Sequence, residues 1–226
     1  MFAASMAFSL GIKLDAIRQG LRTFDSTFFQ APGRMNVFDE HPFKVLFDYG
    51  HNAHAVAAMA DLAQRLDVAG RRIVVVAGPG DRRDEDLREI AQAVAGRFDH
   101  YICRRDDGLR GRTPDEVPKL IAATLRECGV PDAAITLIPD EQEAIDAGLR
   151  MAQHGDLLLV FADALVRSWK QVIKFRPEGM PEAPAPRPRA APVEEPEVTE
   201  PAFVPEQWEG VSRDERGIFI SRESDD

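Results

Sequence analysis

The sequence has little cysteine and no long apolar run. Its two cysteines, Cys103 and Cys128, form no Cys-x-x-Cys pair and no spacing typical of metal ligands. We therefore predict a reduced, cytoplasmic protein without a metal centre of its own. No stretch approaches the roughly 18–20 apolar residues of a membrane-spanning helix, and residues 1–10 lack the basic start of a signal peptide. These absences predict that the protein has no membrane partner.

Basic residues are also in deficit. The chain has 28 Lys and Arg against 38 Asp and Glu, a net charge of -10. Residues 1–176 are near balance, with 23 basic and 25 acidic side chains, whereas residues 177–226 hold 5 and 13. Because a nucleic-acid-binding surface needs a basic footprint, we predict that the protein does not bind nucleic acid.

Lysine is scarce, and none of the five lysines follows a glycine. A phosphate-binding P-loop requires a Gly-Lys pair ahead of a helix, because the lysine reaches the outer phosphates. No P-loop is therefore encoded in these 226 residues.

What the sequence does contain is an alternation of apolar strands and amphipathic helices. The continuous apolar run Ile73 to Val76 is typical of a strand buried on both faces. Such alternation predicts an α/β fold with a mostly parallel sheet covered by helices on both faces. The predicted helices are 3–10, 14–21, 53–66, 84–96, 114–128, 140–153 and 164–174, and the predicted strands are 44–49, 72–77, 99–104, 134–138 and 156–162.

The composition changes after Arg176. Nine of the sixteen prolines lie between Pro177 and Pro205, mixed with alanine and glutamate. Such a segment buries too little apolar surface to offset its ordering entropy, so we expect a disordered linker and tail over 177–226.

Charged side chains follow several of the predicted strands. The turn 31–34 ends in Arg34, whose guanidinium suits a phosphate group, and residues 48–54 place Asp48, His51 and Asn52 at the start of a helix. The alternative for Asp48 or Asn52 is a helix cap, and for His54 an exposed helical position.

Two further loops, 77–84 and 104–112, are rich in glycine, arginine and aspartate, and Asp163 follows the last strand. Ligands of parallel sheets bind at the carboxyl ends of strands, so these loops predict a common site at one edge. Each loop alone is also compatible with a tight turn and a helix cap.

The order of these motifs resembles the C-terminal domain of Mur ligases and folylpolyglutamate synthetases. The shared motifs are Pro32-Gly33-Arg34, Asp48-Tyr49-x-His51-Asn52 and Gly78-x-Gly80-Asp81. Longer segments over about residues 1–175 are similar to the cyanophycin synthetases. They are Gly78-Pro79-Gly80-Asp81-Arg82-Arg83-Asp84, Arg105-Asp106-Asp107-x-Leu109-Arg110-Gly111-Arg112, and Ala162-Asp163 ahead of Trp169-Lys170.

The resemblance implies a Rossmann-like lobe that closes over ATP and Mg²⁺ shared with a preceding central domain. It implies that residues 1–28 are the last helices of that domain, that 29–176 are the C-terminal domain, and that 177–226 lie outside it. The chemistry implied is activation of a carboxylate as an acyl-phosphate and attack by an amine. In cyanophycin synthetases the amine belongs to arginine and the carboxylate to an aspartate side chain.

The resemblance also assigns roles to residues. Asp48 and His51 are the expected catalytic residues, and Arg34, His51 and Asn52 are expected to contact the nucleotide. The family usually reads Ala-His-Asn-Pro where this chain has Gly50-His51-Asn52-Ala53. The residues expected to bind the amino-acid substrate are Gly80, Asp81, Arg82, Arg83, Asp84, Asp106, Asp107, Arg110 and Arg112.

Because no P-loop is encoded, we expect the isolated chain not to turn over ATP. The implied partners are the P-loop and ATP-grasp portion of the ligase, from the same gene or another chain, and an amino acid or polypeptide as substrate. A homo-oligomer is left open. Two alternatives stay open as well: a non-catalytic module that binds a nucleotide or peptide with a partner, and a ligase resembling folylpolyglutamate synthetase.

Overall fold

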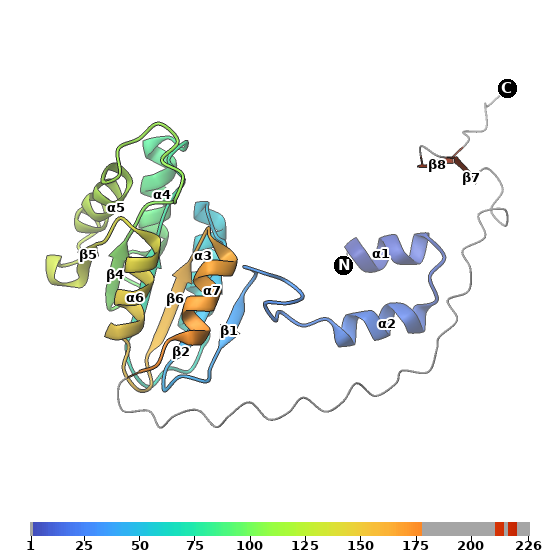
Figure 1. Ribbon diagram of the computed structural model, residues 1–226, viewed down its shortest axis with the longest axis horizontal. Helices are drawn as coiled ribbons and strands as arrows, with labels where there is room; N and C mark the ends of the chain where they lie inside the picture. The colour runs from blue at the N-terminus through green and yellow to red at the C-terminus, as the bar shows by residue number, and fades with distance from the viewer. Residues whose placement is uncertain (1, 178–210, 215–216, 221–226) are drawn as a thin grey trace. The chain divides into compact units, whose positions relative to one another are not determined.

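The computed structural model describes residues 2–177, 211–214 and 217–220, and its centre is a six-stranded sheet (Figure 1). The strand order is β1-β2-β6-β3-β4-β5, with β1 antiparallel to β2 and every other pair parallel. This confirms the predicted parallel sheet. The strands are β1 (Asn36–Phe38), β2 (Lys44–Asp48), β3 (Arg72–Val76), β4 (His100–Cys103), β5 (Ile135–Leu137) and β6 (Leu157–Phe161).

Helices cover both faces of this sheet, as predicted. Figure 1 shows α6 and α7 in front of the strands, while α3, α4 and α5 pack on the other face. The helices of the lobe are α3 (Ala53–Arg65), α4 (Asp84–Val94), α5 (Glu116–Glu127), α6 (Glu141–Met151) and α7 (Leu165–Lys174), with a short 3-10 helix at Asp132–Ala134.

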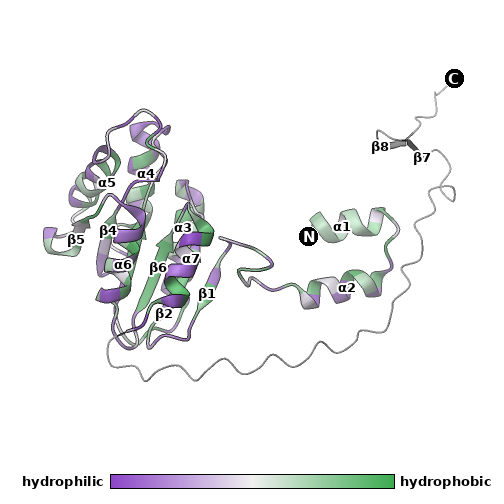
Figure 2. Cartoon of the chain, viewed as in Figure 1, coloured by the Kyte–Doolittle hydropathy of each residue, from purple (hydrophilic) through white to green (hydrophobic). Residues whose placement is uncertain are grey.

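The apolar strands explain the two-sided core. Val74 and Val76 of β3 pack with α3, α4 and α5, whereas Ile73 and Val75 pack with α6 and α7. Strand β6 is fully buried and is green along its length in Figure 2, because its neighbours β2 and β3 and the helices on both faces shield it from water. A strand that is apolar at every position can only occupy such a central place in the sheet.

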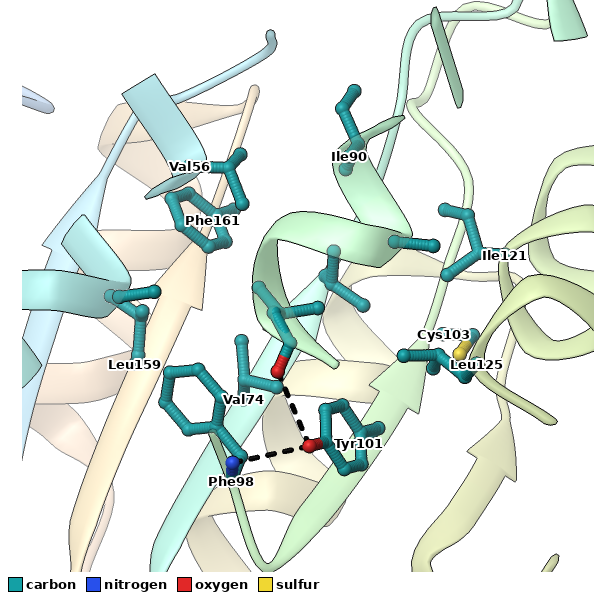
Figure 3. Close-up of a cluster of buried hydrophobic side chains, with 14 of the residues drawn as sticks. Val56, Val74, Ile90, Phe98, Tyr101, Cys103, Ile121, Leu125, Leu159 and Phe161 are labelled. Carbon is teal, nitrogen blue, oxygen red and sulfur yellow. Dashed lines mark hydrogen bonds between the residues drawn. The ribbon is translucent and has the colours of Figure 1, made fainter. Parts of the chain in front are cut away.

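One part of this core contains a buried polar group that is fully satisfied (Figure 3). The Tyr101 hydroxyl donates to the Val94 carbonyl (3.2 Å) and accepts from the Phe98 amide (3.1 Å). Nearby, burial raises the pKa of the Cys103 thiol to about 12, so this cysteine remains a neutral packing residue.

Two helices precede the lobe, and two strands follow it in the chain. Helices α1 (Phe2–Ser9) and α2 (Leu14–Thr23) contain no buried residue. Strands β7 (Val211–Asp214) and β8 (Gly217–Ile220) form an antiparallel pair that the sequence patterns did not predict. The rest of the predicted tail, 178–210, 215–216 and 221–226, lies outside the described residues. No described helix is long and apolar enough to cross a membrane.

Candidate functional site

The loops that follow β2, β3, β4 and β6 meet at the carboxyl edge of the sheet, as the charged loops predicted. Together they line a hollow of about 130 Å³. Parallel strands deliver their loops to the same edge, which explains why residues more than a hundred positions apart converge there. The polar residues at this hollow include Tyr49, His51, Arg82, Asp106, Arg110 and Asp163.

The turn at residues 32–35 is fixed to the end of β2. Asp48 is buried, and its Oδ2 accepts a hydrogen bond from the Met35 amide at 2.8 Å. Met35 has a positive φ of 51°, which is unusual for a residue with a side chain. The Asp48 carboxylate therefore stabilises a strained turn. Arg34, the residue before Met35, lies over the Tyr49 ring at 5.7 Å.

A buried asparagine that the sequence patterns did not single out completes this turn. The Asn36 side chain accepts from the Gly33 amide (2.8 Å) and donates to the carbonyls of Ser26 (2.7 Å) and Ala31 (2.9 Å). The side-chain oxygen of Asn36 and both of its N–H groups thus have hydrogen-bond partners. Asn36 is therefore the residue that gives the Pro-Gly-Arg turn its shape.

At the start of α3, two predicted nucleotide ligands have different surroundings. Asn52 caps the helix, because its Oδ1 accepts from the Ala55 amide at 3.0 Å. His51 contacts the Tyr49 carbonyl through Nδ1 at 3.2 Å and lines the hollow. A second hollow of about 200 Å³ lies beside these two residues and reaches Arg82 and Glu89.

The loops after β3 and β4 are fastened to each other. Arg112 donates to the carbonyls of Gly80 (2.9 Å) and Arg82 (2.7 Å), and Arg110 pairs with Asp81 at 2.9 Å. That hydrogen bond from Arg110 lowers the pKa of Asp81. These contacts keep the two loops at a fixed separation above the sheet edge.

Several predicted substrate ligands are consequently occupied by other protein groups. At the start of α4 the Asp86 carboxylate accepts from the Arg83 amide and pairs with the Arg83 guanidinium at 2.7 Å, and Arg112 pairs with Asp84 at 2.8 Å. Of the nine predicted substrate ligands, three line the first hollow: Arg82, Asp106 and Arg110. The other six lie outside its lining. Arg34 is also outside both hollows.

Asp106 is the most buried of the three, with 8% of its surface exposed. Burial raises the pKa of its carboxyl group, and the nearby Arg104 opposes that shift. Arg104 Nη1 lies 3.8 Å from Asp106 Oδ1. A carboxylate with little water, whose neighbouring Arg104 is shared with Glu141 and Asp163, is suited to binding a cationic ligand.

Arg104 organises this edge; the sequence placed it in the charged loop 104–112 but indicated no role for it. Its side chain is only 1% exposed, and Nη2 donates to the Phe161 carbonyl at 2.7 Å. Its Nη1 lies 3.0 Å from Glu141 and 3.4 Å from Asp163. The signal available in the sequence was an arginine directly after an apolar strand, which is equally typical of an exposed loop.

Carboxylate oxygens of Asp107, Glu141 and Asp163 lie within 4.8 Å of one another, a grouping that could hold a cation. The Arg104 guanidinium already lies against two of them, and Arg167 pairs with Asp107 at 2.6 Å. The counter-charges of this cluster are therefore arginine side chains.

A mostly parallel α/β lobe with a charged hollow at the carboxyl ends of its strands defines the class of this molecule: a lobe of Rossmann-like type. Residues 33–164 match the family described as Mur ligase, glutamate ligase domain. The chain belongs to this family.

The relatives that match the sequence include cyanophycin synthetases. That of Geminocystis herdmanii is 40% identical over 174 residues, which cover 76% of this chain and 20% of the relative. That of Nostoc sp. is 39% identical over 175 residues, covering 77% and 19%. The chain thus spans about a fifth of the length of these relatives.

The solved structures that match have the same lobe. One is E. coli FolC in complex with ADP, without folate substrate, with 25% identity and a TM-score of 0.52; the match covers 71% of this chain and 34% of FolC. The chain therefore contains a Mur ligase C-terminal domain and is similar to cyanophycin synthetases over about three quarters of its length.

Proposed function

We propose that the chain is the amino-acid-binding lobe of an ATP-dependent amide ligase that joins arginine to aspartate side-chain carboxylates through an acyl-phosphate. The observation that carries this proposal is the shielded Asp106 carboxylate at the hollow, in a chain that is 40% identical to a cyanophycin synthetase over 174 residues. A buried carboxylate favours a guanidinium or ammonium ligand over a neutral one, because it gains a counter-charge on binding.

Two arginine side chains near the hollow suit the anionic phosphate groups of the proposed reaction. Within the described residues, Arg34 and Arg82 form no ion pair with a carboxylate. Both are therefore available to phosphate oxygens, and His51 lies between the two hollows. ATP, bound together with Mg²⁺, would supply the phosphoryl group that activates the carboxylate. In this proposal Arg34 and Arg82 hold phosphate oxygens, whereas Asp106 holds the incoming arginine.

His51 and Asp48 act at the same edge in different ways in this proposal. His51 contacts the reacting groups directly, and its ring is oriented by the Nδ1 contact with the Tyr49 carbonyl. Asp48 acts through the turn, since its carboxylate holds the Met35 amide and so positions Arg34. A one-residue shift of this turn would move Arg34 away from the phosphate.

The small volumes of the two hollows favour a site that is completed by another part of the protein or by another chain. The two hollows measure about 130 and 200 Å³, below the roughly 300–1,000 Å³ of pockets that enclose a small molecule. We propose that the partner is the P-loop and ATP-grasp portion of a ligase, because the relatives extend far beyond the matched fifth. The acceptor is an aspartate-containing polypeptide.

The test is a complementation assay. The chain is mixed with a cyanophycin synthetase from which the matching lobe has been removed, and arginine-dependent ADP formation is measured. We expect activity with the wild-type chain and a loss of at least about tenfold with Asp106→Asn. The matched control is Asp115→Asn, an exposed aspartate that pairs only with Lys119, and it should retain activity.

Three outcomes would contradict parts of the proposal. Stimulation by glutamate instead of arginine would favour a folylpolyglutamate-type ligase. Binding of nucleotide without stimulation by any amino acid would favour a non-catalytic module. Turnover of ATP by the chain alone would show that no partner is needed.

A further inference from the structure

Beneath the hollow lies a glutamate that the proposed reaction does not use. Glu141, the first residue of α6, is fully buried. Its carboxylate accepts from the amides of Asp163 (3.1 Å) and Ala164 (3.2 Å) and from the Ser168 hydroxyl. Its Oε2 also lies 3.0 Å from Arg104 Nη1. Glu141 therefore connects α6, the loop after β6 and the end of β4.

Arg104 has little freedom to move away from this glutamate. Its Nε and Nη2 both point to the Phe161 carbonyl, and its Nη1 donates to the Arg105 carbonyl at 2.6 Å. The same Nη1 faces three carboxylates, at 3.0 Å (Glu141), 3.4 Å (Asp163) and 3.8 Å (Asp106). Glu141 is the nearest of the three, and it does not line the hollow.

We propose that Glu141 is the positioning residue that neutralises Arg104, so that Asp106 and Asp163 remain a net negative wall and the site prefers a cationic amino acid. This inference rests on the proposed function, since it explains how that site would select its substrate. Glu141 itself does not contact the ligand.

The charges around Arg104 lie where there is little water. One arginine and three carboxylates leave an excess of two negative charges. If Glu141 were neutral, Arg104 would be shared only by Asp106 and Asp163, the two carboxylates that line the hollow, and the excess would fall to one negative charge. Charges interact strongly at such distances when they are shielded from water, so one buried charge changes the potential of the hollow.

A second link runs through the backbone. Asp163 Oδ2 accepts a hydrogen bond from the Asp107 amide at 3.0 Å, while Glu141 holds the Asp163 amide. The buried glutamate thus also fixes the orientation of the loop that carries Asp106 and Asp107. Shape and charge must be separated experimentally.

The test compares L-arginine with L-citrulline, which has nearly the same shape but no charge. Binding of both to the whole chain is measured by titration calorimetry. Glu141→Gln keeps the shape and removes the charge, and we expect it to lower the preference for arginine at least about fivefold. In Arg104→Met/Glu141→Gln the excess of two negative charges returns, so the preference should recover to within about twofold of wild type.

Two more variants complete the design. Glu143→Gln changes an exposed glutamate of the same helix and should behave as wild type. Glu141→Asp keeps the charge but shortens the side chain, and it should retain the preference for arginine. If Glu141→Gln does not fold, as judged by circular dichroism, Glu141→Asp and the double variant still decide: loss of the preference in either one overturns the proposal.

A readout without ligand separates this inference from the proposed function. In a carbon-13 titration of the aspartate side chains, Glu141→Gln should lower the pKa of Asp106, because Arg104 is then no longer shared with Glu141. If the wild-type chain binds neither amino acid, the proposed function fails and this titration alone decides the role of Glu141. An unchanged pKa of Asp106, or equal loss of arginine and citrulline binding without recovery in the double variant, would overturn the inference.

Discussion

Asn36 is the residue on which the Pro-Gly-Arg turn depends most. It is fully buried and makes three hydrogen bonds to backbone groups of the segment 26–33. Asn36→Ala would leave the Gly33 amide and the Ser26 carbonyl without partners among the described residues, whereas the Ala31 carbonyl still accepts from the Arg34 amide. Each group left without a partner costs about 1–3 kcal/mol. We expect the free energy of unfolding to fall by about 2–4 kcal/mol in urea titrations. Asp39→Ala, an exposed neighbour, should change it by less than about 0.5 kcal/mol.

His41 gives the stability of the lobe a dependence on pH. Its Nε2 lies 2.9 Å from the Val172 carbonyl, and its ring contacts the rings of Phe38 and Phe43. Burial lowers the pKa of His41 below the ordinary value of 6.5, and Arg176 adds to this effect, against an opposing Glu40. Below about pH 6.5 the unfolded chain binds more protons than the folded chain. The free energy of unfolding is therefore highest above about pH 6.5 and decreases as the pH falls below this value.

The measurement is the melting temperature between pH 7.5 and pH 5. We expect it to fall with pH in the wild type and to fall less in His41→Gln, which keeps a donor for the Val172 carbonyl but cannot be protonated. Part of the dependence should remain, because burial also lowers the pKa of His100. His54→Gln, at an exposed position, should follow the wild-type curve. A His41→Gln curve as steep as the wild type would show that His41 does not contribute.

Between elements, the contact of the loops after β3 and β4 depends on a glycine. A Cβ atom on Gly80 would lie 2.2 Å from the Leu109 carbonyl oxygen, a backbone atom that cannot turn aside. Gly80→Ala must therefore separate the two loops, at a cost of about 1–3 kcal/mol in unfolding free energy. It should also weaken amino-acid binding, because Asp106 and Arg110 belong to the displaced loop. Gly80 was expected to bind substrate directly; the geometry favours this packing role.

Gly108→Ala is the matched control, since its Cβ would meet nothing closer than 3.6 Å. We expect this variant to retain both its stability and its affinity. Equal effects of the two substitutions would contradict the packing argument and indicate that the loops tolerate separation.

At the scale of elements, some strands could be predicted from the sequence and others could not. Strands such as Ile73 to Val76 were predictable because only a central parallel strand is apolar throughout. Strand β1 was not, because its three residues Asn36–Phe38 carry no periodic signal and depend on pairing with β2. Arg104 and Glu141 were missed for a related reason: a charged residue at the end of a strand or the start of a helix is typical of the surface, and only tertiary packing buries this pair.

At the scale of the molecule, the lobe presents an open, charged edge rather than an enclosed pocket. At this edge the described residues supply buried carboxylates and two arginines without ion-pair partners, and the two hollows beside His51 measure about 130 and 200 Å³. Catalysis in a water-excluded site requires a surface opposite this edge. The relatives, of which this chain spans a fifth, are long enough to provide one.

The extent of the independently stable lobe can be predicted from contacts across its first residues. The resemblance places the boundary at residue 29, but Phe28 stacks on Trp169 with ring centroids 5.0 Å apart and also meets Phe47 edge-on. Asn36 further donates to the Ser26 carbonyl. A fragment 29–177 loses both interactions, whereas a fragment 24–177 keeps them. The helices α1 and α2, which both fragments lack, contain no buried residue.

We therefore expect fragment 24–177 to have the unfolding free energy of the full chain and fragment 29–177 to be less stable by about 2–3 kcal/mol, from one aromatic cluster and one buried hydrogen bond. Urea titration followed by Trp169 fluorescence measures both, because the stacked indole reports on the loss of Phe28. Phe28→Ala in the full chain should reproduce most of the difference. If fragment 29–177 were as stable as 24–177, the segment before residue 29 would belong to the preceding helices and not to this lobe.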